Sequence, residues 1–483
     1  MKLSELIEGY QGPDVEITGI TADSREVAPG FLFAGLPGVQ IDGASFIDQA
    51  LLQGAVAVLT HDKFDGELPE GVPLLRQEDP RLGLAELAAK FYAPQPDLIV
   101  GVTGTNGKTS VASFVRQIWE QIGIDGASLG TVGIVSKLGE EKLAHTTPDP
   151  VTLHKALKKL TEAGVDHLAL EASSHGLAQR RLDGLNFTAA AFTNITRDHL
   201  DYHETFEAYF NEKKRLFSEL LGENGIAVID ADAPGAGRII EVCETRYMNV
   251  MTIGQKGRYL NIKSCEIDGF SQKLTLVHHR GTSVVHLPLV GHFQASNALV
   301  AAALVAAGGI SISEILPALE KLKGAKGRLE LAGSKDFSEA SQTAPVFIDY
   351  AHTPDALETA IEALLPYKKN KLHVVFGCGG DRDKGKRPMM GEIATRLGDQ
   401  VYVTDDNPRG EDPTVIRSEI LAASPGAVEI GDRALAIETA VRALEPGDIL
   451  LVAGKGHEAG QIIGSEVLPF SDHEAVEAAL AKV

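Results

Sequence analysis

A glycine-rich stretch between an apolar run and an apolar-periodic segment constrains this chain more than any other part of the sequence. The run Leu98–Val100 leads into GVTGTNGKTS at 101–110, and the periodic segment Val111–Ile122 follows, ending before Gly123. This order predicts a strand, a phosphate-binding loop and a helix. Glycines allow successive backbone N–H groups to point inward, and the helix N-terminus adds its positive dipole end. A chance glycine-rich turn is the alternative, against which the flanking strand and helix argue.

The loop carries side chains suited to a nucleoside triphosphate. Lys108 can reach the β- and γ-phosphates, and the Thr109 hydroxyl can bind Mg²⁺. Val102 stands where the common pattern has its first glycine. The loop alone is compatible with a motor, a switch, a kinase or a ligase.

Length and charge narrow the class of protein. A chain of 483 residues exceeds one hydrophobic core and predicts about two to four domains. The net charge of −21 argues against a nucleic-acid or membrane-surface partner. Cys243, Cys265 and Cys378 have no metal-ligand spacing, and the N-terminus has no signal pattern, so we expect a cytoplasmic protein with reduced thiols. The apolar run Ala298–Ile310 is too short to cross a bilayer and predicts a buried helix.

The order of strands and helices predicts an α/β chain of three domains. We expect residues 1–92 to form a small α/β domain, with strands at 17–20, 32–34 and 55–59. Residues 93–327 predict a mostly parallel sheet with helices on both faces, followed by antiparallel strands over 260–290. Residues 328–483 predict a Rossmann-like, doubly wound domain with strands at 346–348, 373–376, 400–403 and 449–452.

Polar motifs follow the strands of the predicted third domain, where open α/β sheets bind ligands. The segment Gly380–Arg387 is a local basic cluster, with a solvated turn as the alternative. Asp406–Arg409 adds an arginine beside amide and carboxylate groups, and Glu458 adds an acid. Such a set could bind a zwitterion, with arginine facing its carboxylate and acid facing its ammonium. A turn at a helix start is the alternative for Asp406–Arg409.

Three segments of the predicted middle domain could complete a phosphate site. Glu171 ends a predicted strand and could hold Mg²⁺, or could be a surface glutamate. Asn194–His203 could bind a metal, or Thr196 or Asp198 could cap the helix that follows. The charged run Glu212–Phe217, on a helix predicted over 206–221, is typical of a solvated face.

Taken together, these motifs resemble the Mur ligases of peptidoglycan synthesis. The matching segments, in the order of that family, are 103–110, 171–176, 194–203, 349–354, 377–388, 406–409 and 454–458. The sequence DNPR at 406–409 is similar to the signature of the diaminopimelate-adding members, from which lysine-adding relatives typically differ. Lysine-adding or folylpolyglutamate-type ligases remain alternatives within the family, and a phosphate-loop ATPase switch is the alternative outside it.

The resemblance implies an ATP-dependent amide ligase. One domain each would bind the uridine nucleotide, ATP and the amino acid. ATP would phosphorylate the D-glutamyl carboxylate of UDP-MurNAc-L-Ala-D-Glu, and the amino group of meso-diaminopimelate would then displace phosphate. Lys108 would stabilise the transferred phosphoryl group. Thr109 and Glu171 would hold one Mg²⁺ and His199 a second, and Lys213 would be a carbamylated lysine of the metal site. We expect a monomer.

The resemblance also assigns binding residues. For ATP they are Gly104, Thr105, Asn106, Gly107, Lys108, Thr109, Ser110, Asn297, Arg328, Asp349 and His352. For the uridine substrate they are Ser24, Thr146, Thr147, Ser173, Gln179 and Arg181. For diaminopimelate they are Arg382, Asp406, Asn407, Pro408, Arg409, Gly454 and Glu458. The chain departs from the family pattern at Val39–Ile41, where a polar residue is usual, at Gln294, where asparagine is usual, and at Gly460, where tyrosine is common.

Overall fold

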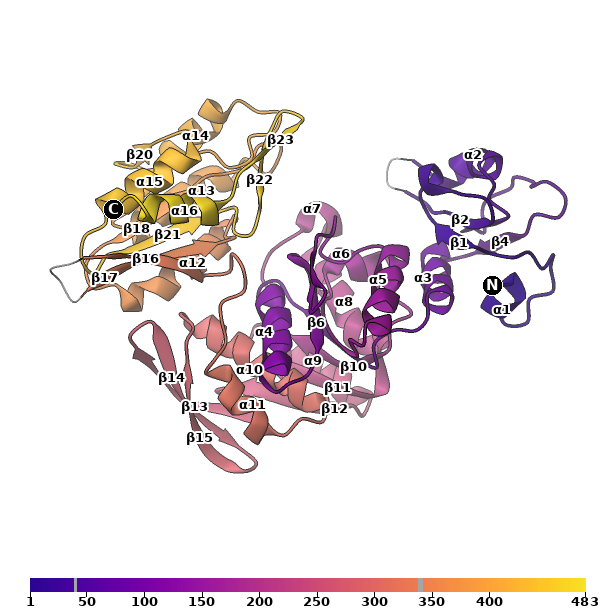
Figure 1. The fold of residues 1–483 in the computed structure, drawn as a ribbon, viewed down its shortest axis with the longest axis horizontal. Helices are drawn as coiled ribbons and strands as arrows, with labels where there is room; N and C mark the ends of the chain where they lie inside the picture. The colour runs from indigo at the N-terminus through magenta and orange to yellow at the C-terminus, as the bar shows by residue number, and fades with distance from the viewer. Residues whose placement is uncertain (39–40, 338–341) are drawn as a thin grey trace. The chain divides into compact units, whose positions relative to one another are not determined.

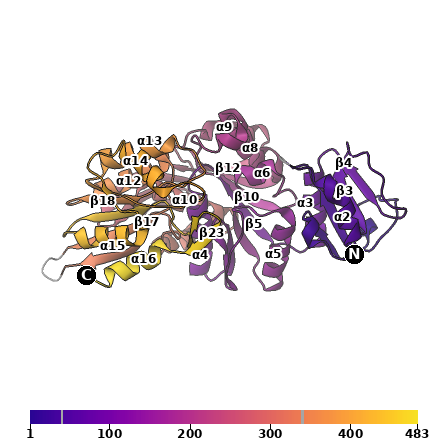
Figure 2. The ribbon, with the colours of Figure 1, turned by 90° about the horizontal axis from the view of Figure 1, so that it is seen from above.

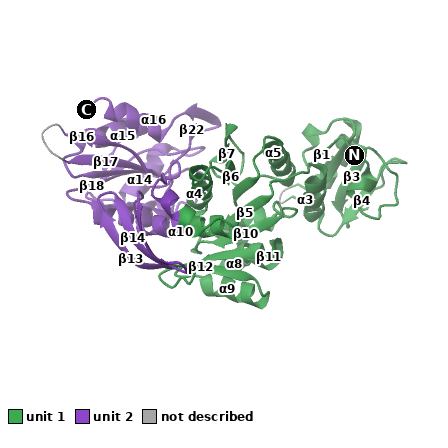
Figure 3. Cartoon of the chain, turned by 60° about the horizontal axis from the view of Figure 1, so that its bottom comes forward, with its two compact units in different colours: residues 1–260, 300–315 green, residues 261–299, 316–483 purple. Residues whose placement is uncertain are grey.

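A computed structural model describes residues 1–38, 41–337 and 342–483 of the chain. Its contacts divide the chain into two compact units (Figure 3). The first comprises residues 1–260 and 300–315, and the second comprises residues 261–299 and 316–483. The three-domain boundaries near 92 and 327 stay a prediction. Within the described residues, no helix combines the length and apolar character that crossing a bilayer requires.

The chain begins with a small parallel sheet (indigo in Figure 1). Its strands are paired in chain order, β1 (Gly19–Thr21), β2 (Phe31–Gly35), β3 (Ala57–His61) and β4 (Leu74–Gln77). The accompanying helices are α1 (Leu3–Leu6), α2 (Ile47–Leu52) and α3 (Pro80–Phe91). Leu84 and Leu87 of α3 pack against Leu32 and Leu59 of the sheet. The predicted strands exist, although β1 and β3 each begin two residues later than expected.

A larger parallel sheet follows in the first unit and contains the glycine-rich loop. Its parallel strands pair in the order β12-β11-β10-β5-β9-β6. They are β5 (Leu98–Thr103), β6 (Gly126–Gly130), β9 (His167–Glu171), β10 (Phe187–Phe192), β11 (Leu221–Asp230) and β12 (Asn249–Gly254). The hairpin β7 (Gly133–Ser136) and β8 (Gly139–Glu141) pairs antiparallel beside β6. Because neighbouring strands are parallel, the loops after β5, β9 and β10 meet at one edge of the sheet.

Apolar faces of the intervening helices form the core of this sheet. The helices are α4 (Lys108–Gln121), α5 (Pro150–Glu162), α6 (Ser174–Ala178), α7 (Leu200–His203), α8 (Phe206–Arg215) and α9 (Ala236–Thr245). Leu157 of α5, Phe210 of α8 and Ile239 of α9 join one buried cluster with the strands. The helix predicted over 206–221 is α8 followed by a π-helical turn at 216–220. The expected buried helix is α10 (His292–Ala307), in which residues 298–305 are nearly inaccessible. Helix α11 (Ile312–Leu319) follows it.

The second unit contains an antiparallel ribbon and a doubly wound sheet. The ribbon is β13 (Leu260–Asp268), β14 (Ser271–His278) and β15 (Gly281–Leu287), as predicted over 260–290. The sheet has the strand order β16-β17-β21-β18-β19-β20, in which only β16 is antiparallel to its neighbour. These strands are β16 (Glu330–Asp336), β17 (Thr343–Asp349), β18 (Leu372–Phe376), β19 (Gln400–Val403), β20 (Val428–Glu429) and β21 (Ile449–Ala453).

Alternate strand residues face two helical layers in this unit. Figure 2 shows α12 (Pro354–Leu364), α13 (Lys386–Leu397) and α14 (Pro413–Leu421) on one face, with α15 (Arg433–Ala443) and α16 (Asp472–Leu480) on the other. Val374 and Leu451 belong to the core of the first face, whereas Val375 and Leu450 belong to that of the second. The Rossmann-like prediction is therefore correct. Strands β16 and β20 and the hairpin β22 (Gly460–Ile463) and β23 (Glu466–Pro469) were not predicted.

Candidate active site

The glycine-rich loop joins β5 to α4, as the sequence predicts. Gly107 is the N-cap of α4 with φ 90°, and Gly104 has φ 148°. A Cβ atom on Gly104 would lie 2.0 Å from Oγ1 of Thr193, so only glycine fits there. The loop is fixed to the end of β10, because Asn106 N–H donates to Oδ1 of Asn194 at 3.0 Å and the Thr193 hydroxyl donates to Asn106 O at 2.6 Å. The glycine that the loop geometry requires is at position 104, and position 102 lies inside β5 as a buried valine.

The side-chain nitrogens of two lysines meet at one carbonyl of this loop. Lys108 Nζ donates to the carbonyl oxygens of Gly104 at 2.8 Å and Thr105 at 2.7 Å. Lys213 Nζ, from α8, donates to the same Gly104 oxygen at 2.7 Å. Lys213 is 1% exposed and lies 4.4 Å above the ring of Tyr209. Burial lowers the pKa of Lys213 well below its ordinary value, and the charge of Lys108 lowers it further.

The solvated-face interpretation of Glu212–Phe217 is wrong for its two buried cations. Lys213 lies against the phosphate loop, and Arg215 is 8% exposed. Arg215 donates to Leu177 O at 2.9 Å and forms an ion pair with the buried Asp183. One turn of α8 therefore directs two cations into the protein, where each has a specific acceptor.

Glu171 is a buried carboxylate at the end of β9, which excludes the surface alternative. It is 2% exposed. Its Oε1 accepts from Thr131 N–H at 2.8 Å, and its Oε2 accepts from the hydroxyls of Thr109 and Thr131, both at 3.1 Å. Carboxylate and hydroxyl oxygens are the ligands that Mg²⁺ prefers. Glu171 and Thr109 thus fit a magnesium site beside the phosphate loop.

The segment after β10 is partly bound to the loop and partly exposed. Thr196 N–H donates to the Thr105 hydroxyl at 3.0 Å. The side chain of His199 is 45% exposed and lies 3.4 Å from Asp198. Helix α7 has His199 at its N-cap without a side-chain capping bond, so neither Thr196 nor Asp198 caps it. Among the described residues, no three or more His, Cys, Asp or Glu side chains are placed to hold a metal. The role of His199 as a ligand of a second Mg²⁺ stays a prediction.

Five of the six residues expected to bind the uridine substrate form one hydrogen-bonded group. The Thr147 hydroxyl donates to Glu171 O at 2.8 Å and lies 2.9 Å from the Ser173 hydroxyl. Arg181 donates to Thr147 O at 2.6 Å and to Oε1 of Gln179 at 2.8 Å. The fifth member, Thr146, joins the group through Thr131: the Thr146 hydroxyl lies 3.1 Å from that of Thr131, which in turn binds the side chain of Glu171.

The sixth residue, Ser24, lies in the N-terminal sheet region, where its hydroxyl is 3.4 Å from Oε1 of Gln49. Of the departure at 39–41, Val39 and Gln40 lie outside the described residues.

The residues expected near ATP in the second unit also form a connected group. Asn297 donates to Oε1 of Gln294 at 3.1 Å, and Gln294 donates to Arg328 O at 3.1 Å, so Gln294 joins Asn297 to Arg328. The Arg328 guanidinium lies 4.5 Å above the ring of Tyr350. Asp349 accepts from the N–H groups of Leu329 and Ala351 at 2.6 and 2.7 Å, and burial raises the pKa of its carboxyl to about 6. His352 Nδ1 lies 2.8 Å from Tyr350 O.

The residues expected to bind the amino acid gather after β19 and β21. Asp406 and Asn407 are buried, at 7% and 4% exposure. Asn407 Nδ2 donates to Oε2 of Glu458 at 2.9 Å. A Cβ atom on Gly454 would lie 2.7 Å from Oδ2 of Asp406, which explains the glycine. Arg409 has φ 50° and donates to Gly380 O at 3.0 Å. Helix α14 is capped by Asp412, so 406–409 is not a helix start.

The basic segment after β18 divides into an exposed and a buried part. Residues 381–385, which include Arg382, are exposed, as the solvated-turn alternative predicts. Arg387 is fully buried and pairs with Glu411 at 2.9 Å and Glu419 at 2.7 Å. Glu411 also accepts from Asp381 N–H at 2.7 Å. These bonds fix the loop of Arg382 to the loop of Arg409.

Comparison with known proteins gives the family of this chain. Family models match residues 16–92 (Mur ligase family, catalytic domain), 102–305 (Mur ligase middle domain) and 327–456 (Mur ligase, glutamate ligase domain). A UDP-N-acetylmuramoyl-L-alanyl-D-glutamate–2,6-diaminopimelate ligase of Mesorhizobium japonicum is 51% identical over 99% of both chains. The chain belongs to the Mur ligase family. A solved structure of a ligase with the same name is 32% identical, with a TM-score of 0.72 over 100% of this chain and 99% of that one. A MurF ligase from Thermotoga maritima in complex with ADP shares the fold at 20% identity, with a TM-score of 0.63 over 96% and 97% of the two chains.

Several polar residues of this Mur ligase site were not singled out from the sequence. Lys455 is fully buried and binds Asn407 and Glu458. Arg433, at the start of α15, pairs with Asp472 of α16 at 2.7 Å and donates to Ala453 O at 3.0 Å. Both sides of that pair are inaccessible. Lys455 lies inside the GKGHE motif and could have been noted there, whereas nothing in the sequence pairs Arg433 with a residue 39 positions later.

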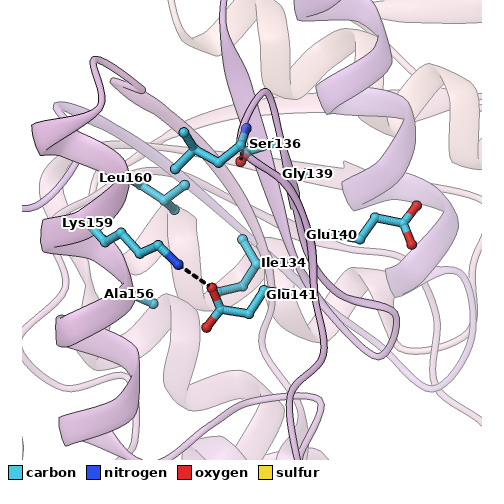
Figure 4. A pocket seen from close by; sticks show the side chains of 9 residues that line it. Ile134, Ser136, Gly139, Glu140, Glu141, Ala156, Lys159 and Leu160 are labelled. Carbon is cyan, nitrogen blue, oxygen red and sulfur yellow. Dashed lines mark hydrogen bonds and ion pairs between the residues drawn. The ribbon is translucent and has the colours of Figure 1, made fainter.

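A small pocket of this ligase lies apart from these residues. It has a volume of about 200 Å³ between the β7–β8 hairpin and α5 (Figure 4). Ile134, Ala156 and Leu160 provide apolar lining, and Lys159 reaches Glu141 across it at 2.6 Å. None of the predicted site residues lines this pocket.

Proposed function

We propose that this Mur ligase adds meso-diaminopimelate to UDP-MurNAc-L-Ala-D-Glu, with conversion of ATP to ADP and phosphate. The observation that carries the proposal is the polar set after β19 and β21, in which Arg409, Asn407 and Glu458 offer a cation, an amide and an acid within one hydrogen-bonded group. The distal end of diaminopimelate carries both a carboxylate and an ammonium, whereas that of lysine carries only an ammonium. The name of the 51% identical relative supports the same substrate.

The phosphate loop would bind ATP through its backbone N–H groups and the N-terminus of α4. Lys108 would exchange the carbonyls of Gly104 and Thr105 for phosphate oxygens and stabilise charge on the transferred group. Thr109 and Glu171 would hold Mg²⁺, which supplies positive charge at the phosphates when bound. The D-glutamyl carboxylate of the uridine substrate would attack the γ-phosphorus, giving an acyl phosphate and ADP.

The amide bond would form in the second step. An amino group of diaminopimelate attacks the acyl carbon, the carbon–oxygen bond to phosphate breaks, and the nitrogen loses a proton. Arg382 and Arg409 would bind carboxylates of the amino acid, and Glu458 and Asp406 would face its distal ammonium. Gly454 would let the chain pass close to Asp406. These contacts orient the amine, which provides the main advantage over reaction in solution.

Lys213 would carry a carbamate. Its burial and its pKa, which lies well below the ordinary value, favour the uncharged amine that attacks CO₂. The nitrogen–carbon bond forms as the amine proton leaves, and a neutral or cationic side chain becomes an anion. An anion beside Lys108 at the phosphate loop would offer oxygen atoms of the kind that Mg²⁺ prefers.

We further propose the division of labour expected for this family. Residues 1–92 with the group around Thr147 and Arg181 would bind the uridine nucleotide, residues 93–327 would bind ATP, and residues 328–483 would bind the amino acid. The enzyme would act as a monomer in the cytoplasm, where its nucleotide substrates are made.

An amino-acid panel tests the proposal. The enzyme is incubated with UDP-MurNAc-L-Ala-D-Glu, ATP, Mg²⁺ and one of three amino acids: meso-diaminopimelate, L-lysine or L-glutamate. The UDP-linked product is then separated and identified by mass spectrometry. Product with diaminopimelate at low concentration is expected, together with phosphate release that requires both co-substrates. Preference for lysine would contradict the substrate. Phosphate release that is unchanged when both co-substrates are omitted would contradict ligation and indicate an ATPase.

A further inference from the structure

Lys455 is a buried lysine in the amino-acid site. It follows β21, its side chain is fully inaccessible, and Nζ donates to Oδ1 of Asn407 and to Oε2 of Glu458, both at 3.0 Å. Lysine is rarely fully buried unless it is paired, because its charge must leave water. Here its two acceptors belong to the side chains that the proposed function assigns to the amino acid. Lys455 can therefore fix the orientation of both side chains, Asn407 and Glu458.

The hydrogen bonds of Asn407 allow only one orientation of its amide. Oδ1 accepts from Lys455 and from Ile462 N–H at 3.0 Å, while Nδ2 donates to Oε2 of Glu458 at 2.9 Å. The reversed amide would place its NH₂ against two donors and its oxygen against a carboxylate. Asn407 Nδ2 thus keeps one hydrogen for a ligand.

Glu458 is fixed by the same contacts. Its Oε2 accepts from both Lys455 and Asn407. Its Oε1 has no hydrogen bond within the described part of the chain, and the side chain is 32% exposed. The group therefore offers a donor from Asn407 and an acceptor from Glu458, which is the polarity that a carboxylate and an ammonium on one carbon require.

We propose that Lys455 is a positioning residue that sets this polarity and thereby the preference for diaminopimelate over lysine. The inference rests on the proposed function and names a determinant of its specificity. Without the ammonium, Oδ1 of Asn407 keeps Ile462 N–H but loses its second donor, so the amide is held less firmly and presents its remaining Nδ2 hydrogen less well to the distal carboxylate. Only diaminopimelate carries that carboxylate, whereas the distal ammonium of lysine needs the acceptor of Glu458 alone. Loss of Lys455 therefore weakens binding of one amino acid and spares the other.

The substitution Lys455→Met tests the inference, since methionine fills similar space without charge. We expect KM for diaminopimelate to rise about tenfold, the range for losing a hydrogen bond to a charged group. KM for ATP should stay within about twofold, and the ratio of kcat/KM for diaminopimelate to that for lysine should fall about tenfold. Lys455→Gln keeps an N–H donor in similar space. Its KM for diaminopimelate and its specificity ratio should lie between those of the unchanged enzyme and those of Lys455→Met.

Two comparisons separate positioning from general stability. Lys335→Met is the matched control, because Lys335 Nζ caps carbonyls of Arg442 and Leu444 at 2.9 and 3.0 Å, away from the site residues. It should leave the ratio unchanged. In an Asn407→Ala background, Lys455→Met should change the ratio no further, because the side chain through which it acts is gone.

The outcomes are distinct. If the unchanged enzyme forms no diaminopimelate product, the proposed function fails. If it does and the ratio is unaltered in folded Lys455→Met and Lys455→Gln, or if the effects of Lys455→Met and Asn407→Ala add, the role of Lys455 is refuted. Thermal unfolding of each variant establishes that it is folded. If one of the two Lys455 variants does not fold, the ratio measured for the other decides the test.

Discussion

The substitution Glu171→Gln separates the structural from the catalytic role of the buried carboxylate. Glutamine keeps the shape of the side chain and one oxygen, which can remain on Thr131 N–H in place of Oε1. Its NH₂ then faces the hydroxyls of Thr109 and Thr131, which can rotate to accept. All three hydrogen bonds can thus be kept with their direction partly reversed.

The stability cost should accordingly be small. No donor or acceptor is left without a partner, so the free energy of unfolding should fall by less than about 1 kcal/mol. Glu171→Ala is the comparison, because it leaves Thr131 N–H without its acceptor and should cost about 1–3 kcal/mol in addition to lost packing. Urea unfolding of the two variants measures the difference.

The effect on activity should be large. The amide carries no charge and binds Mg²⁺ poorly, so we expect phosphate release in the complete reaction to fall by at least about 100-fold and half-saturation to require more Mg²⁺. Ser136→Ala, in the β7–β8 hairpin, is a control that should change neither quantity. A folded Glu171→Gln with activity within about threefold of the unchanged enzyme and the same Mg²⁺ dependence would refute the magnesium role.

Three further substitutions test other parts of the site and the fold. Arg409→Ala should raise KM for diaminopimelate far more than KM for ATP, by at least about tenfold, because it removes a guanidinium and no phosphate contact; equal changes in both constants would contradict the assignment. Lys213→Ala should abolish activity, and acetate should restore part of it by replacing the carbamate; full activity without acetate would exclude the modification. His154 is 1% exposed, and burial lowers its pKa to about 4. Because its folded pKa lies below its unfolded value, stability should be lost as pH falls from about 6.5 towards 4. His154→Leu should remove about 2.5 kcal/mol of the difference in unfolding free energy between pH 7.5 and 4.5, and identical pH profiles would contradict this origin.

The regular part of the fold was predictable because burial is periodic. Strands such as Val374–Phe376 are apolar on both faces, as parallel strands between two helical layers must be, and the helices have one apolar stripe. The sequence predicted β1 and β3 to begin two residues too early, because Thr18 and Ala55 are compatible with strand or turn. The hairpin β22–β23 was missed because β23 is exposed and β22 only half-buried, so neither strand shows the apolar pattern of a core strand.

The polar interior was harder to predict. A charged run such as Glu212–Phe217 gives no sign that Lys213 and Arg215 point inward, because the acceptors, Gly104 O and Asp183, lie far away in the sequence. Motif resemblance identified Lys213 where composition pointed the wrong way. It did not identify Arg433 and Asp472, which make no ligand contact in the proposed mechanism; Arg433 instead binds the carbonyl at the end of β21.

The pair of Arg433 and Asp472 also has a consequence for the order of folding. Arg433 donates to the carbonyl of Ala453, the last residue of β21, while its counter-ion comes from α16. Until α16 docks, the guanidinium lacks the partner that makes its burial tolerable, and breaking such a pair costs about 3–5 kcal/mol. The central strands β17, β18 and β21 are joined by backbone pairing and buried apolar side chains, so this part of the sheet can form earlier. During refolding, recovery of diaminopimelate-dependent activity should therefore lag behind recovery of the far-ultraviolet circular dichroism, and simultaneous recovery would show that α16 docks together with the sheet.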